Sequence, residues 1–153
     1  MNKLYGTLNE LLVKLFNDIL RIEEQSLKDD EFSNLSITEI HVIEAIGQTQ
    51  ERNMSSVARD LDITIGTLTI AINNLLRKGY VNRTRSNEDR RIVLISLTEK
   101  GEAAYKHHSQ FHNEMIKTTI SKLSDEEMKV LISALENINT YFKEKYNLKR
   151  KYK

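Results

Sequence analysis

Two long stretches of the chain repeat apolar residues at the spacing of an α-helix. One stripe covers residues 4–28 and contains Leu4, Leu8, Leu11, Leu12, Leu15, Ile19 and Ile22. The other precedes residue 146 and contains Met128, Leu131, Ile132, Leu135, Ile138 and Phe142. Apolar residues three or four positions apart share one helix face, so each stretch predicts an amphipathic helix. Both stripes are more apolar than a lone surface helix needs, and we expect each to pack against a large surface such as a second copy of the chain.

The middle of the chain predicts three shorter helices from their end signals. Ser36 and Glu39, in "SITE", form a capping-box pattern that opens a helix over 37–47. A short helix is expected over 55–61. Thr64 is a suitable N-cap for a helix over 65–78, which Gly79 closes. Residues 62–64 leave room only for a tight turn, so the last two helices form a helix-turn-helix unit.

A β-hairpin and two further helices complete the predicted order. "YVNRTR" and "RIVLISL" alternate apolar and polar residues around "SNED", which predicts two strands and a turn. Thr98 opens a helix to about residue 120, and "SDEE" at Ser124–Glu127 is a second capping box. The expected fold is mainly α with a small β-hairpin wing, in the order α-α-α-α-β-β-α-α. No repeat or linker divides the chain, so we expect one domain over 1–153. Residues 34–98 form its winged helix-turn-helix part, and 1–33 and 99–153 form dimerisation helices.

The expected helix over 65–78 has one apolar and one small, uncharged polar face. Its apolar side holds Leu68, Ala71, Ile72, Leu75 and Leu76, and the residues at and beside its outer face are Thr64, Ile65, Gly66, Thr67, Thr69, Ile70, Asn73 and Arg77. Such a surface can enter a DNA major groove, where hydroxyls and amides bond base edges and methyl groups touch thymine. The helix N-terminus with Thr64 also suits a phosphate. The alternative is an ordinary amphipathic helix with a polar exterior.

Positive charge collects after this helix although the net charge is only +1. Segment 77–91 carries six basic residues, Arg77, Lys78, Arg83, Arg85, Arg90 and Arg91, against two acidic ones, Glu88 and Asp89. Residues two apart on a strand share a face, so Arg83 and Arg85 point the same way. Arg90 and Arg91 lie at the hairpin tip, where an arginine can enter a minor groove. The alternatives are a solvated surface, or a pairing of Asp89 with Arg91 that only holds the turn.

Composition excludes several classes of protein. The chain has no cysteine, which rules out disulfides and thiolate metal sites. No apolar run approaches the roughly 20 residues of a membrane span. The N-terminal stretch carries Glu10, Lys14 and Asp18 between its apolar positions, unlike a signal peptide, so a cytoplasmic location is expected. No phosphate-binding loop or nucleophile motif is present, so we expect no enzyme. A metal-dependent enzyme remains an alternative that a hydrolytic assay would test. A purely structural helical protein is another alternative, but it would not need an arginine-tipped hairpin.

These motifs resemble the MarR family of winged helix-turn-helix repressors. "RSNEDRRIVLISLTEKG" resembles the wing signature of that family, and "GTLT" followed by "LLRKGYV" resembles its recognition helix. The resemblance covers essentially the whole chain. It implies a transcriptional repressor that forms an obligate homodimer and binds double-stranded DNA at a near-palindromic operator, with two recognition helices about one helical turn apart.

Within this family the chain is most similar to the repressors of fatty acid biosynthesis genes, the FabT type. The similar segments are "IEEQSLKDDEFSNLSITEIHVIEAIG", "IGTLTIAINNLLRKGY", "RSNEDRR" and "HHSQFHNEMI" with "LSDEEM". The resemblance implies a long-chain acyl group on acyl carrier protein as corepressor. The acyl chain would enter an apolar cavity between the helices over 4–28, 37–47 and 99–120. The acidic carrier would dock on a basic patch.

Zinc is the alternative effector. His108 and His112 are four residues apart and share a helix face. In the zinc-responsive branch of the same family, the positions of Glu24, His41, His108 and His112 resemble metal ligands. One carboxylate and three imidazoles would suit tetrahedral zinc. A third interpretation is that these histidines only form hydrogen bonds where the helices meet or line the acyl pocket.

Overall fold

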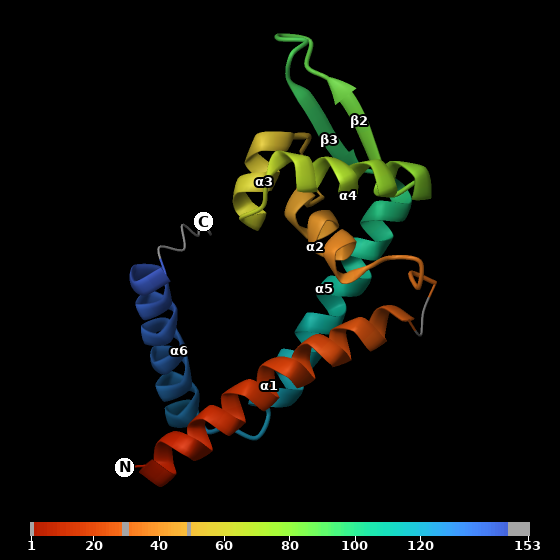
Figure 1. The fold of residues 1–153 in the computed structure, drawn as a ribbon. Coiled ribbons are helices and arrows are strands. Elements are labelled where there is room, and N and C mark those ends of the chain that lie inside the picture. The colour runs from red at the N-terminus through yellow and green to blue at the C-terminus, as the bar shows by residue number, and fades with distance from the viewer. Residues whose placement is uncertain (1, 29–30, 49, 147–153) are drawn as a thin grey trace.

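A computed structural model describes residues 2–28, 31–48 and 50–146, with Asn2 described by its backbone. Its elements are α1 (Asn2–Lys28), α2 (Ile37–Ile46), β1 (Arg52–Asn53), α3 (Met54–Leu61), α4 (Ile65–Lys78), β2 (Val81–Arg85), β3 (Val93–Leu97), α5 (Glu99–Ile120) and α6 (Asp125–Tyr146). Figure 1 shows α2, α3 and α4 gathered below the β2–β3 hairpin, with α1 and α6 further away. The expected dimerisation segment 99–153 extends past the described residues at 147–153.

The predicted helix ends are confirmed closely because their capping side chains are in place. Ser36 and Glu39 form the reciprocal capping box of α2. Thr64 accepts a hydrogen bond from the backbone of Thr67 at the start of α4. Gly79 ends α4 at φ 80°, a left-handed conformation that favours glycine. Asp62 ends α3 at φ 55° and supplies the sharp bend of the helix-turn-helix.

A third strand corrects the predicted order. β1 pairs with β3, which places β3 in the centre of an antiparallel sheet in the order β1-β3-β2. Only two residues form β1, too few to show an alternating pattern. Arg52 instead locks β1 to the helices, because its guanidinium donates to the Ala45 carbonyl at 2.5 Å and to Asp60 at 2.6 Å. The hairpin is thus tied to α2 and α3 at its base.

One core lies where α2, α3, α4, α5 and the sheet meet. α2 packs against α3, α4 and α5, and α4 packs against β2. The fully buried large side chains are Tyr80, Leu27, Ile40, Ile43, Leu68, Ile72, Leu75, Ile95, His108, Val42 and Val57. The apolar face predicted for α4 is buried as expected except for Leu76, which is partly exposed. The opposite face of α4 is consequently held outward.

The two terminal helices remain largely exposed. No residue of α6 is buried, and the stripe of α1 is exposed at Leu4, Leu8, Leu11, Leu15 and Ile22. α6 stands away from the helix-turn-helix and follows α5 through a short turn (Figure 1). Among the described residues, no helix combines the length and apolar character that crossing a bilayer requires.

Candidate nucleic-acid interface and a buried histidine cluster

The outer face of α4 presents small polar and apolar side chains without a carboxylate. Its exposed residues from the predicted set are Thr64, Ile65, Gly66, Thr67, Ile70, Asn73 and Arg77, while Thr69 is partly exposed. The Thr64 and Thr67 hydroxyls lie 2.9 Å apart, and the Thr69 hydroxyl donates to the Ile65 carbonyl at 2.7 Å. Arg77 donates to the Asn74 side chain. The threonine contacts orient the hydroxyls on the first turns of α4, and the Arg77 contact lies near its end.

The wing carries the four predicted arginines, all of them exposed. Arg83 reaches back to α4 and donates to the Asn73 side-chain oxygen at 3.1 Å. Arg85 donates to the Arg90 carbonyl at 3.3 Å. Asp89 does hold the turn, but it accepts from the backbone N–H of Arg91 at 2.9 Å. This contact between Asp89 and Arg91 thus uses the Arg91 backbone.

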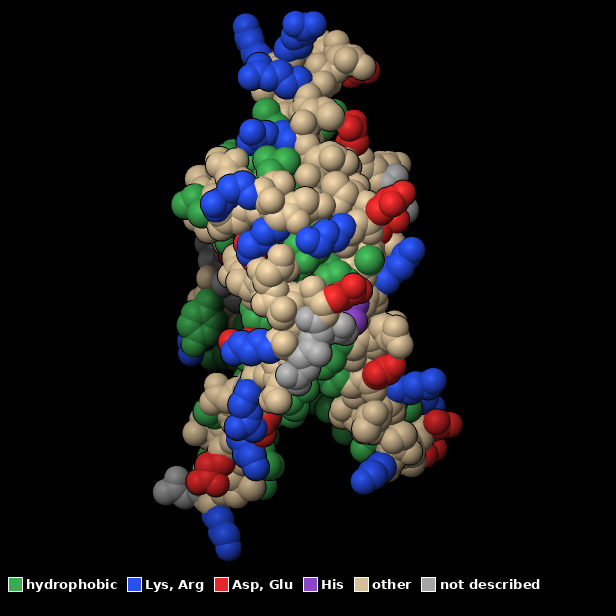
Figure 2. All heavy atoms as spheres, turned by 90° about the vertical axis from the view of Figure 1, so that its right-hand side faces the viewer, with side chains coloured by type: hydrophobic (Ala, Val, Ile, Leu, Met, Phe, Trp, Pro, Cys, Tyr) green, Lys and Arg blue, Asp and Glu red, His purple; other side chains and the backbone are tan. Residues whose placement is uncertain are grey.

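A groove of about 890 Å³ separates the wing from α3 and α4. Its lining residues are Asn53, Met54, Ser55, Arg59, Ile65, Thr69, Arg83, Thr84, Arg85, Arg91, Ile92 and Val93. In Figure 2 the basic side chains gather at the wing tip and continue down the same side of the molecule. The groove therefore combines four guanidinium groups with the start of α4, which is a suitable setting for a phosphate backbone.

Arg59, Asn53 and Ser55 belong to this groove but were not among the predicted residues. They lie on β1 and at the start and middle of α3. The exposed side of α3 places Ser55 and Arg59 four residues apart, on one helix face. This spacing of a serine and an arginine could have indicated from the sequence that one side of α3 faces the groove. Of the twelve predicted residues, five line the groove, Ile65, Thr69, Arg83, Arg85 and Arg91. The other seven lie outside its lining: Thr64, Gly66, Thr67, Ile70, Asn73, Arg77 and Arg90.

The C-terminal end of α4 is anchored through a partly buried ion pair. Lys78 donates to both carboxylate oxygens of Glu39, at 2.9 and 2.7 Å, and to the Asn34 carbonyl at 2.6 Å. Beside it, the buried Tyr80 donates its hydroxyl to the Asn34 side chain at 2.7 Å. Lys100 of α5 completes the anchor by donating to the Lys78 carbonyl at 3.0 Å. The angle at which α4 leaves the core is thus set by α2, α5 and the loop before α2.

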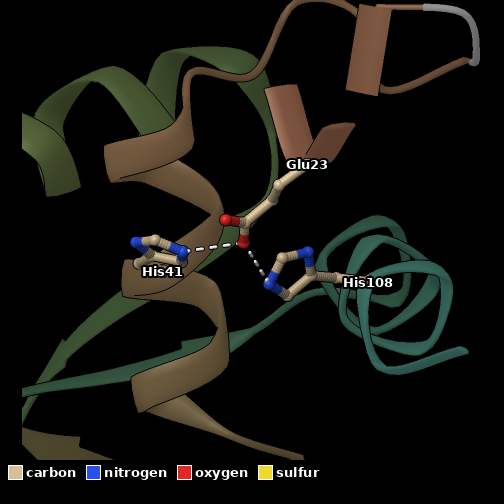
Figure 3. Close-up of side chains that lie close together, drawn as sticks. All are labelled: Glu23, His41 and His108. Atoms are coloured by element: carbon tan, nitrogen blue, oxygen red, sulfur yellow. Dashed lines mark hydrogen bonds and ion pairs between the residues drawn. The ribbon is translucent and has the colours of Figure 1, made fainter. Parts of the chain in front are cut away.

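A polar cluster lies where α1, α2 and α5 meet (Figure 3). The Glu23 carboxylate is buried and its Oε1 lies 2.9 Å from His41 Nε2, 3.3 Å from His108 Nε2 and 3.4 Å from His112 Nε2. The Nε2 atoms of His108 and His112 are 3.1 Å apart. Side chains from three helices therefore surround the Glu23 carboxylate, and the ligand atoms of Glu23, His41 and His108 all lie within 4.8 Å of one another. The centre of this junction is polar, whereas an apolar cavity was expected there.

The carboxylate in the cluster is Glu23, which corrects the predicted ligand set. Glu24 points to solvent and pairs with Lys28 at 2.7 Å. Consecutive residues on a helix diverge by about 100°, so only one of the two glutamates can face the core. The three histidines of the predicted set are all present.

A second carboxylate borders the cluster from α2. Glu44 Oε2 lies 3.7 Å from His108 Nε2, and Glu44 is half exposed. The nearby His108 ring lowers the pKa of Glu44 below its usual 4.5, and partial burial opposes this shift. Glu44, His108 and His112 thus form a second set of ligand atoms at the solvent edge.

Glu23, His41 and His108 offer ligand atoms of the types that zinc binds, close to one another. Ligands bound tetrahedrally at zinc–nitrogen distances of about 2.0–2.1 Å lie about 3.3 Å from one another. The Glu23 oxygen lies 2.9–3.4 Å from one nitrogen of each of the three histidines, and the His108 and His112 nitrogens are 3.1 Å apart, so these four separations are close to this value. The buried Nδ1 of His108 has no hydrogen-bond partner among the described residues, and metal-bound histidines usually have one. The spacing of the ligand atoms therefore suits zinc, but the hydrogen bond that usually orients a metal-bound histidine is missing at His108 within the described part of the chain.

A helix-turn-helix followed by an arginine-bearing hairpin defines a winged helix-turn-helix protein. Residues 24–108 match the family model described as transcriptional regulator SarA/Rot. The chain therefore belongs to the SarA/Rot and MarR family of winged helix-turn-helix transcriptional regulators, and this confirms the predicted family and fold class.

Individual relatives agree with this assignment. A crystal structure of Streptococcus pneumoniae FabT in complex with DNA is 39% identical, with a TM-score of 0.87, over 92% of this chain and 98% of that chain. Two HTH-type regulators of Bacillus subtilis, both of uncharacterized function, are similar as well. YpoP is 28% identical over 84% of this chain and 89% of its own length. YhjH is 29% identical over 69% of this chain, which spans 59% of YhjH. These relatives are transcriptional regulators, which confirms the expectation that the chain is not an enzyme.

Proposed function

We propose that this regulator is a sequence-specific repressor that binds operator DNA as a homodimer. The observation that carries the proposal is the groove in which the start of α4 and the wing arginines face one another. With α4 in a major groove, this arrangement brings the wing to the neighbouring backbone and minor groove. Within the single domain over 1–153, residues 34–98 would then contact DNA, and the helices on either side would join two protomers.

Two kinds of contact follow from the chemistry of the face. The tip residues Arg90 and Arg91 are exposed and positively charged. They would contact phosphates or the minor groove and so strengthen binding to every DNA sequence. Thr67 and Asn73 present short polar groups from α4, so they would contact base edges and determine the preferred sequence. Thr64, Ile65, Gly66, Thr69, Ile70, Arg77, Arg83 and Arg85 surround these contacts.

Fluorescence anisotropy with an operator duplex tests this division of roles. Arg91→Ala should weaken all sequences and lower the salt dependence of log Kd by about one unit. Thr67→Ala should change the preferred sequence at a cost of about 1–3 kcal/mol for a lost base contact. Arg21→Ala removes the same charge from α1 and serves as the control. Unchanged affinity in both variants would show that this face does not bind DNA.

Dimerisation is supported by the exposed stripes of α1 and α6. Ile132 and Leu135 of α6 are about half exposed in the single chain, and Leu4 and Leu11 of α1 are exposed further. Each such side chain contributes about 1.5–3 kcal/mol when it leaves water. Sedimentation at micromolar concentration should therefore give a dimer, and Leu135→Glu should dissociate it while the neighbouring Glu136→Gln does not. A wild-type monomer would contradict the proposal.

Control of fatty acid biosynthesis genes, with long-chain acyl-acyl carrier protein as corepressor, is the regulatory role we favour. It rests on the resemblance to FabT-type repressors, which the 39% identity to FabT over 92% of this chain supports. The acyl chain would lie between the dimerisation helices and the helix-turn-helix, beside the polar cluster. It would tighten DNA binding only if it favours the state whose recognition helices match the operator spacing.

Zinc is a second candidate effector, favoured by the geometry of the histidine cluster. Glu23, His41, His108 and His112 would hold the ion, with Glu44 as an alternative carboxylate. Bound zinc would supply charge that ties α1, α2 and α5 together. Because α2 and α5 also anchor the end of α4, such a link could alter the orientation of the recognition helix.

A parallel titration separates the two effectors. Operator affinity is measured with apo-carrier, with long-chain acyl-carrier and with zinc, and a coupling of about 1–3 kcal/mol corresponds to a change of roughly 5–150-fold. Tightening by acyl-carrier alone supports the acyl corepressor. Tightening by zinc that is lost in the His108→Ala, His112→Ala double variant supports the metal. Operator binding that responds to none of the three would leave the DNA-binding role intact and remove both effectors.

A further inference from the structure

The pair formed by Asn73 and Arg83 links the recognition helix to the wing. Arg83 of β2 donates from Nη1 to Asn73 Oδ1 of α4 at 3.1 Å, and both side chains are exposed. Asn73 lies more than two turns into α4 on its outer face. Arg83 lines the groove between wing and helix. The contact therefore sits where both elements would meet DNA.

The hydrogen bond determines which atoms of Asn73 face outward. A guanidinium has five N–H donors and no acceptor, so it must contact the amide oxygen of Asn73. The oxygen is then engaged, and the Nδ2 group presents its two N–H donors. The remaining N–H groups of the Arg83 guanidinium are also donors. Together the two side chains offer several hydrogen-bond donors toward DNA, and Arg83 already occupies one of the two lone pairs of their only side-chain acceptor, the Asn73 oxygen.

We infer that Asn73 and Arg83 act as one base-reading unit that selects guanine in the major groove. This inference rests on the proposed DNA-binding role of α4. Guanine presents two acceptors, N7 and O6, in the major groove, which match a surface made of donors. Adenine presents one acceptor and one donor, and an asparagine that binds it bidentately must accept through its own oxygen, where Arg83 competes for position. Cytosine presents only a donor. Arg83 is thus a positioning residue that acts through the Asn73 amide.

A simpler alternative is that Arg83 contacts a DNA phosphate, and that its hydrogen bond to Asn73 has no part in reading bases. The two roles give different measurements. A lost phosphate contact weakens all sequences equally and lowers the salt dependence. A lost orientation changes which base is preferred at one position of each half-site and leaves the other positions unchanged.

Selection from a randomised duplex library, followed by competition with single-base variants of the best site, distinguishes them. Asn73→Ala first identifies the position that Asn73 reads. At that position the wild type should prefer guanine over the other bases by about 5- to 150-fold, the range of one good bidentate contact. Arg83→Ala frees the Asn73 oxygen and should raise the acceptance of adenine at the same position. Asn73→Asp keeps a partner for Arg83 but loses the outward donors, so the guanine preference should disappear.

Arg85→Ala is the matched control. Arg85 lies two residues along the same strand and face, but donates to the Arg90 carbonyl. It should weaken all sequences without changing any preferred base, and thermal unfolding checks that every variant is folded. A preference for adenine in the wild type, no position that responds to Asn73→Ala, or an Arg83→Ala profile identical in shape to the wild type would each overturn the inference. A wild type without sequence-specific binding would instead overturn the proposed function.

Discussion

The ion pair between Lys78 and Glu39 gives a specific prediction about the anchor of the recognition helix. Glu39 has only 5% of its side chain exposed and Lys78 has 31%. The Lys78→Met variant keeps the length of the side chain and removes its charge. The Glu39 carboxylate would then retain its hydrogen bond from the Ser36 backbone at 2.8 Å and lose both bonds from Lys78.

The magnitude follows from this burial. Removing one partner of a fully buried pair costs about 3–5 kcal/mol, because the other charge remains buried without compensation. Water can reach the position of Lys78, so we expect the lower value of about 2–3 kcal/mol. Adding Glu39→Gln should restore about 1–2 kcal/mol, because the neutral amide removes the buried charge while its oxygen still accepts from Ser36.

Urea unfolding at one fixed protein concentration measures these values, since the stability of a dimer depends on concentration. The four proteins of the double-mutant cycle are compared with Lys106→Met, a change at an exposed lysine of α5. A loss below about 0.5 kcal/mol in Lys78→Met, the level of a surface pair, would refute the reasoning. So would a double variant that is less stable than Lys78→Met alone.

Two other predictions concern the same junction. Burial raises the pKa of Tyr80 above its usual 10.0. Above that pH the unfolded chain releases a proton that the folded chain keeps, so stability should fall as pH rises, and Tyr80→Phe should flatten that fall in melts recorded across the range. In Gly101→Ala the added methyl would lie 2.1 Å from the Tyr80 carbonyl oxygen, and backbone must move. We expect a loss of about 1–3 kcal/mol or more in urea unfolding, whereas Gly66→Ala, with only an ordinary contact at 3.8 Å, should not destabilise. Equal stability of the two alanine variants would contradict the packing argument.

Local signals predicted most of the fold because they act within one element. The N-caps Ser36 and Thr64 and the left-handed Gly79 define helix ends through neighbouring backbone groups, so spacing alone locates them. β1 could not be predicted, because its two residues are held by the contacts of Arg52 with Ala45 and Asp60. Those contacts arise only after α2 and α3 have packed.

The sequence predicted which types of residue form the candidate sites. It predicted less well which side chains contact one another there. The spacing of His108 and His112 indicated a shared helix face, and the structure places both in the cluster with His41. The choice between Glu23 and Glu24 depended on the rotation of α1 about its axis, which the apolar stripe defines only broadly. The bond between Arg83 and Asn73 joins a strand to a helix, and its existence depends on the angle between those elements.

The short strand β1 fixes the wing at its base and leaves its tip unsupported. It pairs with Ile95 and Leu94 of β3, so the central strand is bonded on both sides near the core, while Val93 pairs with Arg85 alone. Amide hydrogens should therefore exchange slowly at the base of the hairpin and progressively faster toward Arg90 and Arg91. A tip that opens without disturbing its base can search along a phosphate backbone while α4 keeps its alignment. The first encounter with DNA and the final reading of its bases would then proceed at separate rates.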